Sequence, residues 1–168
     1  KLFAQYPWTM SDDMVKEAAA DILAKHFDEN NNVEVWKQCL HSIDLTTLNG
    51  EDTTEKVEKM AQAVNEFEDH FPEIPNVAAM CVYPALVQTA ADTLTEPIGI
   101  AAVAAGFPAS QTFVEIKVAE SAMAVAAGAT EIDIVISIGK FLEGNYQEVF
   151  DEISEVKAAI QDAHLKVI

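Results

Sequence analysis

"EIDIVISIG" (Glu131–Gly139) is followed by "NYQEVFDEISEVKAAIQDAH" (Asn145–His164) and then by "LKVI" (Leu165–Ile168). The first and last of these segments are short apolar runs, which are typical of buried strands. The middle segment repeats apolar residues at helical spacing. Strands that alternate with helices of this length pair in parallel, through right-handed crossovers. This stretch therefore predicts a parallel α/β fold.

The same unit recurs upstream, beginning at Ser42. Each apolar run of strand length precedes an amphipathic segment, and Pro84 and Gly128 mark a helix start and a helix stop. In total the sequence predicts five strands and four complete strand-to-helix crossovers. The upstream runs and their helical segments are "SIDLTTL" (42–48) with 51–71, "VAAMCVY" (77–83) with 85–94, and "IGIAAVAAGFP" (98–108) with 112–128.

Two architectures satisfy this pattern, an open doubly wound sheet and a closed eight-stranded barrel. No glycine-rich phosphate-binding motif follows the first strand, which disfavours the nucleotide-binding version of the doubly wound fold. The residues before the first strand are predicted to be helical over 11–27 and 33–40, with a break at "ENNN" (29–32). We therefore expect an N-terminal helical extension over 1–40 and an α/β domain over 41–168.

Composition excludes several classes of partner. The 168 residues carry 28 acidic and 10 basic side chains, a formal net charge of −18, which repels nucleic acids and anionic membranes. No apolar run is long enough to span a bilayer and no signal peptide is present, so a cytoplasmic location is expected. The two cysteines and four histidines lack the spacing of a zinc site, so neither a metal nor another cofactor is expected.

Three of the five predicted strands contain a charged residue where a helix-covered strand is normally apolar. Asp44, Asp133 and Lys166 each lie between two aliphatic neighbours. Because strand side chains alternate in direction, neighbours that face the helices leave all three charges facing one interior. Such a group is a candidate active site, since buried charges persist when they are paired or when function needs them. A purely structural ion pair explains the same pattern.

Lys166 gives this candidate site a specific chemistry. Desolvation in an apolar site is expected to lower the pKa of the lysine, so that its neutral amine adds to a carbonyl and forms a Schiff base. A neighbouring carboxylate can relay protons for carbinolamine dehydration and for the imine-to-enamine step. The reaction class would be a metal-free aldol cleavage or condensation.

Six segments resemble the deoxyribose-phosphate aldolase family, in the family's order and at similar spacing, from about Leu40 to the last residue. The resemblance implies a (β/α)8 TIM barrel, of which about the first five strands are present. It also implies a class I lyase that cleaves 2-deoxy-D-ribose 5-phosphate to acetaldehyde and D-glyceraldehyde 3-phosphate in deoxyribonucleotide and carbohydrate catabolism. The segments are "IDLTTL" (43–48), "MCVYP" (80–84), "GFP" (106–108) with Lys117 and Glu120 downstream, "GATEIDIVISIG" (128–139), "LEGNYQEV" (142–149) and "LKVI".

Matched residue by residue, the resemblance implies roles for five positions. Lys166 falls on the Schiff-base lysine, and Asp133 on the carboxylate that relays protons through water. Asp44 falls on an aspartate that lines the substrate pocket, while Leu48 and Cys81 resemble positions in its wall. The residues alone also allow a structural interpretation of two of these positions. Cys81 fits a small buried hydrophobic residue, and Asp44 fits a residue that stabilises the turn after its strand.

The sequence also departs from the family. The family's second active-site lysine, on the strand after the Schiff-base strand, and its glycine-rich phosphate-binding segments are not among these 168 residues. Ser110 stands where many relatives carry glycine. Lys117 and Glu120, three apart on a predicted helix, are expected to form a local ion pair. Both ends look like cuts through a longer polypeptide, so the chain by itself is expected to be incomplete and inactive.

Two alternatives remain open. In the first, the chain is a non-catalytic partial barrel that is stable only as a homo-oligomer, because an open sheet leaves an edge strand unpaired. In the second, it is another lysine-dependent barrel aldolase with a different carbonyl substrate. Trp8 and Trp36 fit either a cap on the barrel or an oligomer contact.

Overall fold

The computed structural model describes residues 9–168, so the N-terminal residues up to Trp8 lie outside the described part. The chain forms two compact units, one that ends at Cys39 and one from Leu40 to Ile168. Helix α2 (Asp12–Asn30) begins after Ser11, whose hydroxyl accepts a hydrogen bond from the N–H of Met14. Helix α3 (Val33–His41) follows it. Both helices predicted before the first strand are therefore present.

The second unit is built on a parallel sheet of five strands in the order β1-β2-β3-β4-β5. Each strand neighbours the one before it in sequence, as in a (β/α) barrel, whereas the strand order of a doubly wound sheet reverses. The predicted α/β class and all five strands are confirmed. They are β1 (Asp44–Thr46), β2 (Ala79–Val82), β3 (Gly99–Ala104), β4 (Glu131–Ile134) and β5 (His164–Val167).

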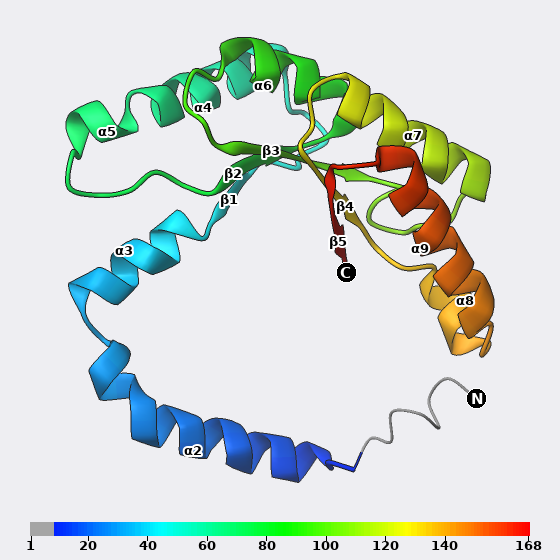
Figure 1. Cartoon of the computed structure of the whole chain (residues 1–168), viewed down its shortest axis with the longest axis horizontal. Coiled ribbons are helices and arrows are strands. Elements are labelled where there is room, and N and C mark those ends of the chain that lie inside the picture. Colours follow the sequence, from blue (N-terminus) through cyan, green and yellow to red (C-terminus); the bar gives the residue numbers. More distant parts are fainter. Residues whose placement is uncertain (1–8) are drawn as a thin grey trace. The chain divides into compact units, whose positions relative to one another are not determined.

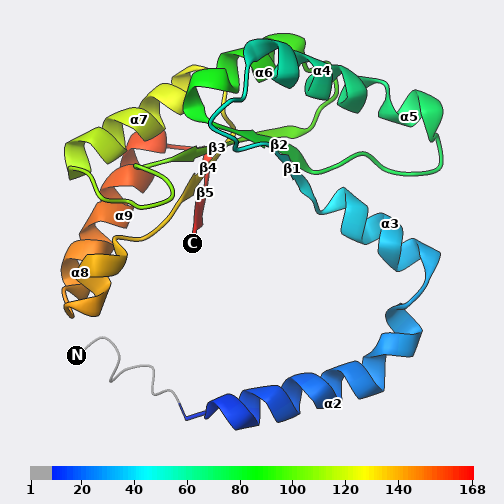
Figure 2. The ribbon, with the colours of Figure 1, turned by 180° about the vertical axis from the view of Figure 1, so that it is seen from behind.

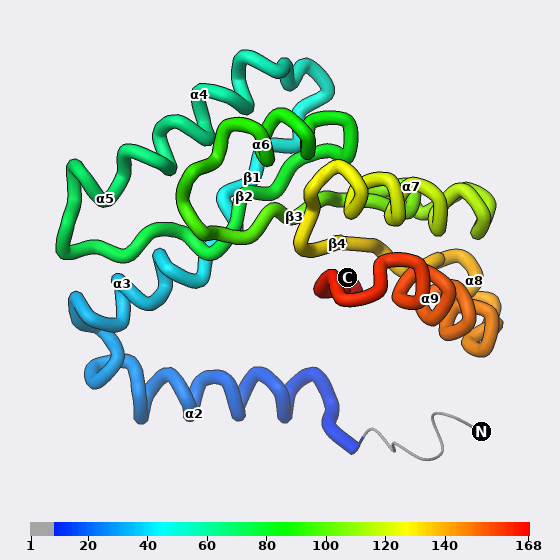
Figure 3. Tube along the Cα trace, turned by 45° about the horizontal axis from the view of Figure 1, so that its top comes forward, coloured from blue at the N-terminus to red at the C-terminus, as the bar shows by residue number. Residues whose placement is uncertain are grey.

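The helices of this unit connect successive strands. They are α4 (Thr54–Asn65), α5 (Phe67–His70), the 3-10 helix η1 (Pro84–Leu86), α6 (Val87–Thr93), α7 (Val114–Ala126), α8 (Ile138–Leu142) and α9 (Tyr146–Ile160). Helices α4, α6, α7 and α9 cover one face of the sheet, in the front view and from behind (Figures 1 and 2). The trace in Figure 3 follows each strand into its helix and back to the next strand. Among residues 9–168, no helix is both long and apolar enough to cross a membrane.

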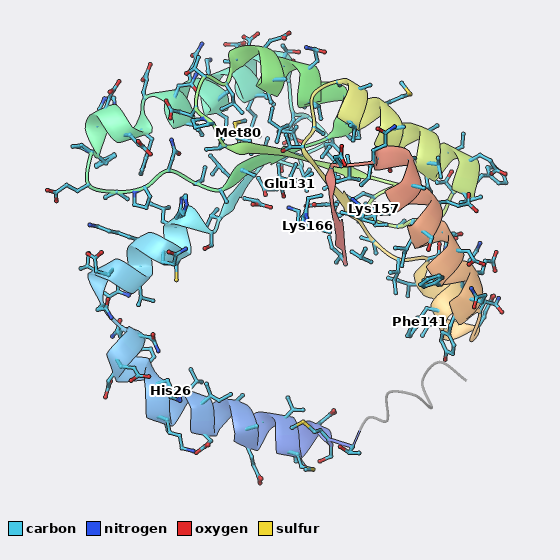
Figure 4. The ribbon with its side chains drawn as sticks, viewed as in Figure 1. His26, Met80, Glu131, Phe141, Lys157 and Lys166 are labelled. Carbon is cyan, nitrogen blue, oxygen red and sulfur yellow. The ribbon has the colours of Figure 1, made fainter. Side chains whose placement is uncertain are left out.

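The hydrophobic core lies between the sheet and this helix layer. Met80 and Ile132 are fully buried there, and Val156 of α9 belongs to the same cluster. Figure 4 shows Met80 on the helix side of the sheet and Glu131 and Lys166 on the opposite side. The alternation of strand side chains thus separates an apolar helix-facing layer from an interior face that carries polar residues.

Helix α7 stops at the predicted glycine. Gly128 has a φ of +113°, and its N–H donates to the carbonyl oxygen of Val125 over 3.0 Å. A Cβ at this position would lie 2.9 Å from the Cβ of Ala91 on α6. Glycine is therefore needed both for the backbone angle and for the close approach of α6.

Ser110 adopts a left-handed conformation in the loop after β3. Its φ is +54°, its side chain is buried, and its N–H donates to the carbonyl oxygen of Gly106 over 2.8 Å. This conformation costs a residue with a Cβ about 1–2 kcal/mol, of which the higher unfolded-state entropy of glycine cancels up to about 1 kcal/mol. We expect Ser110→Gly to raise the free energy of unfolding by up to about 1 kcal/mol, measured by urea denaturation. A clear loss of stability would show that the serine side chain contributes more than the backbone strain costs.

Candidate active site

The interior face of the sheet brings Lys166, Asp44 and Asp133 together. The ammonium of Lys166 donates a hydrogen bond to the Asp44 carboxylate, and its Nζ lies 3.1 Å from Oδ1 of Asp133. Lys166 and Asp133 are direct partners in the register of β5 and β4. Asp44, in contrast, belongs to β1, at the other edge of the sheet. A contact between the two edge strands requires the sheet to curl, as the wall of a barrel does.

Glu131 is a fourth member of this cluster, which sequence reasoning missed. Its Oε2 lies 3.0 Å from Nζ of Lys166 (Figure 4). Because Glu131 precedes Asp133 by two residues on β4, it shares the same face of the strand. This two-residue spacing could have identified Glu131 from the sequence. A charged residue at the first position of a strand, however, is ordinarily assigned to the solvated strand end.

The four side chains are largely removed from solvent. The side chain of Asp133 is 13% exposed, and those of Lys166, Asp44 and Glu131 are between 25% and 30% exposed. Oδ1 of Asp133 is buried and accepts no hydrogen bond from the described residues, although Nζ of Lys166 lies 3.1 Å away. This oxygen is therefore a buried acceptor beside the amine that has no hydrogen-bond donor of its own.

The pKa of Lys166 is raised, so the expectation of a lowered value was wrong. Burial does lower this pKa, but the contacts of the amine with the carboxylates of Asp44, Glu131 and Asp133 outweigh the effect of burial. The physical reason is that three carboxylates surround one amine, and each favours the ammonium form. Schiff-base chemistry at Lys166 therefore requires a neighbouring group to accept a proton before the amine can attack a carbonyl.

Asp133 and Cys81 are also perturbed. Burial raises the pKa of Asp133, against the opposing effect of Lys166, and the carboxylates of Asp44 and Glu131 raise it further. A carboxyl group that holds its proton more readily than an ordinary aspartate is better suited to donate a proton as well as to accept one. Burial and the charge of Asp133 raise the pKa of the Cys81 thiol, so this side chain stays neutral and contributes shape and apolar surface.

Leu48 and Cys81 lie in a small apolar cluster on the same interior face. Cys81 is packed there with Ala101 and Val103 of β3, and Leu48 borders the cluster with Tyr83. The Tyr83 hydroxyl donates to the carbonyl oxygen of Leu48 over 3.3 Å. The cluster gives the charged group an apolar flank, as the wall of a substrate site requires.

Asp52 orders the loop that carries Leu48 after β1. Its carboxylate accepts hydrogen bonds from the Thr47 hydroxyl over 2.8 Å and from the Asn49 N–H over 3.0 Å, and it pairs with Lys56 at 2.5 Å. These contacts, chiefly the one with Lys56, lower the pKa of Asp52 to about 2. The ionised form of this one side chain therefore holds the loop together.

We expect Asp52→Asn to flatten the acid dependence of stability. The folded-state pKa lies below the ordinary value of 3.8, so the carboxylate stabilises the fold above that value, and this contribution disappears as the pH falls toward 2. The variant should unfold more easily than the wild type at pH 7 and differ little from it near pH 2. Urea denaturation at several pH values measures this, with Glu55→Gln, at an exposed acid, as the matched control. Parallel pH profiles for wild type and Asp52→Asn would contradict the expectation.

Lys117 and Glu120 do not pair with each other, contrary to the sequence-based expectation. Lys117 is buried, and its Nζ donates to Ser137 Oγ over 2.6 Å and to Glu152 Oε2 over 3.0 Å. Glu120 instead accepts a hydrogen bond from the N–H of Gly106 over 2.9 Å. The local pairing loses because α7 buries Lys117 against α9, where a carboxylate across the helix interface neutralises it.

A curled parallel α/β sheet with a lysine amine among carboxylates on its interior face is a candidate site for lysine-dependent chemistry in a barrel fold. Residues 39–168 match the model of the DeoC/LacD family aldolases. The chain belongs to this family.

Relatives of the chain carry the name deoxyribose-phosphate aldolase. The human enzyme is 39% identical over 137 residues, which are 75% of this chain and 43% of the human protein. The mouse enzyme matches to the same extent. Among solved structures, the deoxyribose phosphate aldolase of Aeropyrum pernix, a tetramer, has a TM-score of 0.66 at 25% identity and covers 89% of this chain and 58% of its own. The chain thus spans about half the length of the relatives it matches.

Proposed function

We propose that the protein acts as a class I, metal-independent deoxyribose-phosphate aldolase. It would cleave 2-deoxy-D-ribose 5-phosphate to acetaldehyde and D-glyceraldehyde 3-phosphate. The observation that carries the proposal is the amine of Lys166 among the carboxylates of Asp44, Glu131 and Asp133 on the interior face of the sheet. The names of the human and mouse relatives support the substrate.

The proposed reaction begins with a proton transfer, because Lys166 is held as an ammonium. The neutral amine then adds to the C1 aldehyde of the open-chain sugar, and loss of water gives an iminium ion. Loss of the proton from the 3-hydroxyl breaks the C2–C3 bond, which releases D-glyceraldehyde 3-phosphate and leaves an enamine on Lys166. Protonation of the enamine at C2 and hydrolysis release acetaldehyde and regenerate the lysine.

In this scheme Asp133 relays protons, directly or through water. Its buried Oδ1 lies 3.1 Å from the amine of Lys166 and accepts no hydrogen bond from the described residues. Its raised pKa lets it alternate between accepting and donating a proton. Asp44 would bind a substrate hydroxyl, and Leu48 and Cys81 would form the apolar wall.

The proposal extends to the setting of the enzyme. Residues 41–168 form the aldolase domain, in our reading, and residues 1–40 an N-terminal extension. The enzyme would work without a cofactor in the cytoplasm, in deoxyribonucleotide catabolism, as a homo-oligomer. The tetrameric relative from Aeropyrum pernix supports the last point.

The test is cleavage of 2-deoxy-D-ribose 5-phosphate by the protein at its natural length, with acetaldehyde coupled to NADH oxidation by alcohol dehydrogenase. Borohydride added with the substrate should inactivate the enzyme by reducing the imine, while EDTA should leave it active. Inactivation by EDTA but not by borohydride would contradict the class I mechanism. Faster cleavage of a different aldol sugar phosphate would favour another lysine-dependent aldolase.

A further inference from the structure

Glu131 contacts the reactive lysine but has no role in the scheme above. The charged and titratable groups around Lys166 come from β1, β2 and β4, and His164 of β5 itself lies on the same face, opposite Glu131 in the register. Strand β1 supplies Asp44, β4 supplies Glu131 and Asp133, and β2 supplies Cys81, whose thiol stays neutral. Strand β3 presents the non-titratable side chains of its alternate residues. The amine therefore has two carboxylate partners besides Asp133.

Small residues at the start of β3 and β2 leave the space that the Glu131 side chain occupies. A Cβ at Gly99 would lie 2.7 Å from Oε1 of Glu131 and 3.1 Å from the Cβ of Ala79. Neighbouring positions of the interior face also carry small side chains, with Ala79 opposite Gly99 and Ala101 opposite Glu131 in the register. The Glu131 carboxylate thus occupies space that only small residues leave open, at a fixed distance from Lys166.

The three carboxylates stand in different relations to the amine. Asp44 accepts a hydrogen bond from Lys166, and Glu131 forms an ion pair at 3.0 Å. Asp133 is as close, at 3.1 Å, but its Oδ1 is the buried oxygen that accepts no hydrogen bond. All three carboxylates thus pair with the ammonium, but only Asp133 presents to it an oxygen that has no hydrogen bond.

We propose that Glu131 is a positioning residue, which together with Asp44 holds the ammonium of Lys166 in place and so leaves Asp133 free to move protons. This inference rests on the proposed function, to which it adds a division of labour among the carboxylates. Glu131 contacts the lysine directly, so its effect on catalysis would pass through the charge state and the position of the amine. Removal of its negative charge makes the neutral amine easier to form.

The test measures Lys166 in the absence of sugar. Trace labelling of the protein with isotopically labelled acetic anhydride at pH 9, followed by peptide mass analysis, gives the relative reaction rate of each lysine, which follows its fraction of neutral amine. An opposite charge at this distance shifts a pKa by about one unit or more. Glu131→Gln should therefore raise the labelling rate of Lys166 by about three- to tenfold, with the other lysines unchanged.

Three further variants separate positioning from a merely structural effect. Glu131→Asp keeps the charge and should restore a labelling rate close to that of the wild type. Gly99→Ala leaves Glu131 in the sequence but displaces its carboxylate, and it should raise the rate by less than Glu131→Gln does. Glu155→Gln removes the same charge from an exposed position of α9 and should change nothing. Each variant is first checked for a wild-type thermal transition.

The outcome also distinguishes this inference from the proposed function. Faster labelling of Lys166 in Glu131→Gln supports the inference, even if no imine forms with 2-deoxy-D-ribose 5-phosphate. An unchanged rate in Glu131→Gln overturns the inference, even if the wild type cleaves the sugar. A rate that rises equally in Glu131→Asp also overturns it, because side-chain shape and not charge would then control the lysine.

Discussion

Lys166→Arg is expected to abolish aldol cleavage, with turnover reduced by roughly 10³-fold or more. Arginine keeps a positive charge among the carboxylates of Asp44, Glu131 and Asp133, so the electrostatic balance of the site is largely preserved. The guanidinium does not lose its proton and forms no imine with an aldehyde. The loss of activity therefore reports the missing nucleophile and not a collapse of the charged cluster.

The matched control is Lys59→Arg, the same replacement at an exposed lysine that pairs with Glu55. It should leave turnover and stability unchanged, because an exposed helical ion pair contributes little. The measurement is the rate of acetaldehyde release from 2-deoxy-D-ribose 5-phosphate, with circular dichroism to establish that both variants are folded. Wild-type turnover in Lys166→Arg would remove this residue from the mechanism.

Lys117→Met should produce the largest loss of stability, about 3–5 kcal/mol in the free energy of unfolding. Lys117 is only 2% exposed, and its ammonium contacts both Ser137 and Glu152. Methionine matches the length of the side chain but leaves the buried Glu152 carboxylate without this partner. Breaking a buried pair from one side is costly because the remaining charge is poorly solvated. Urea denaturation measures the change.

Lys140→Met provides a control on the same carboxylate. Lys140 pairs with Glu152 Oε1 at 2.7 Å and with Glu148 at 2.5 Å, but its side chain is 36% exposed. Water can replace its contacts, so its loss should cost much less than the loss of Lys117. The double variant Lys117→Met with Glu152→Gln should recover part of the stability lost in Lys117→Met. Equal losses from the two lysines would contradict the assignment of this network as a buried one.

The fold was largely predictable because the sequence patterns that specify its strands and helices each act over a short stretch of the chain. Alternation of apolar runs and amphipathic segments located all five strands, and Gly128 marked a helix end through local backbone geometry. The short helix α8 was missed, since five residues carry too little periodicity to be recognised. The segment 51–71 was predicted as one helix, but it breaks at Glu66, whose N–H donates to the carbonyl oxygens of Gln62 and Val64.

Three of the four charged residues of the candidate site were predictable from the sequence, but their electrostatic arrangement was not. Strand parity places Asp44, Asp133 and Lys166 on one face, and the structure brings them into contact. The direction of the Lys166 pKa shift depends on how many carboxylates reach the amine, which only the curled sheet determines. In the same way, the partner of Lys117 lies 35 residues away on another helix, beyond any rule of helical spacing.

The decisive measurement is a peptide mass map of the protein after borohydride reduction in the presence of 2-deoxy-D-ribose 5-phosphate. We predict a single reduced adduct, located on Lys166 and absent from Lys166→Arg. An adduct on a different lysine, or cleavage of the sugar with no adduct on any lysine, would contradict the assignment of Lys166 as the Schiff-base residue.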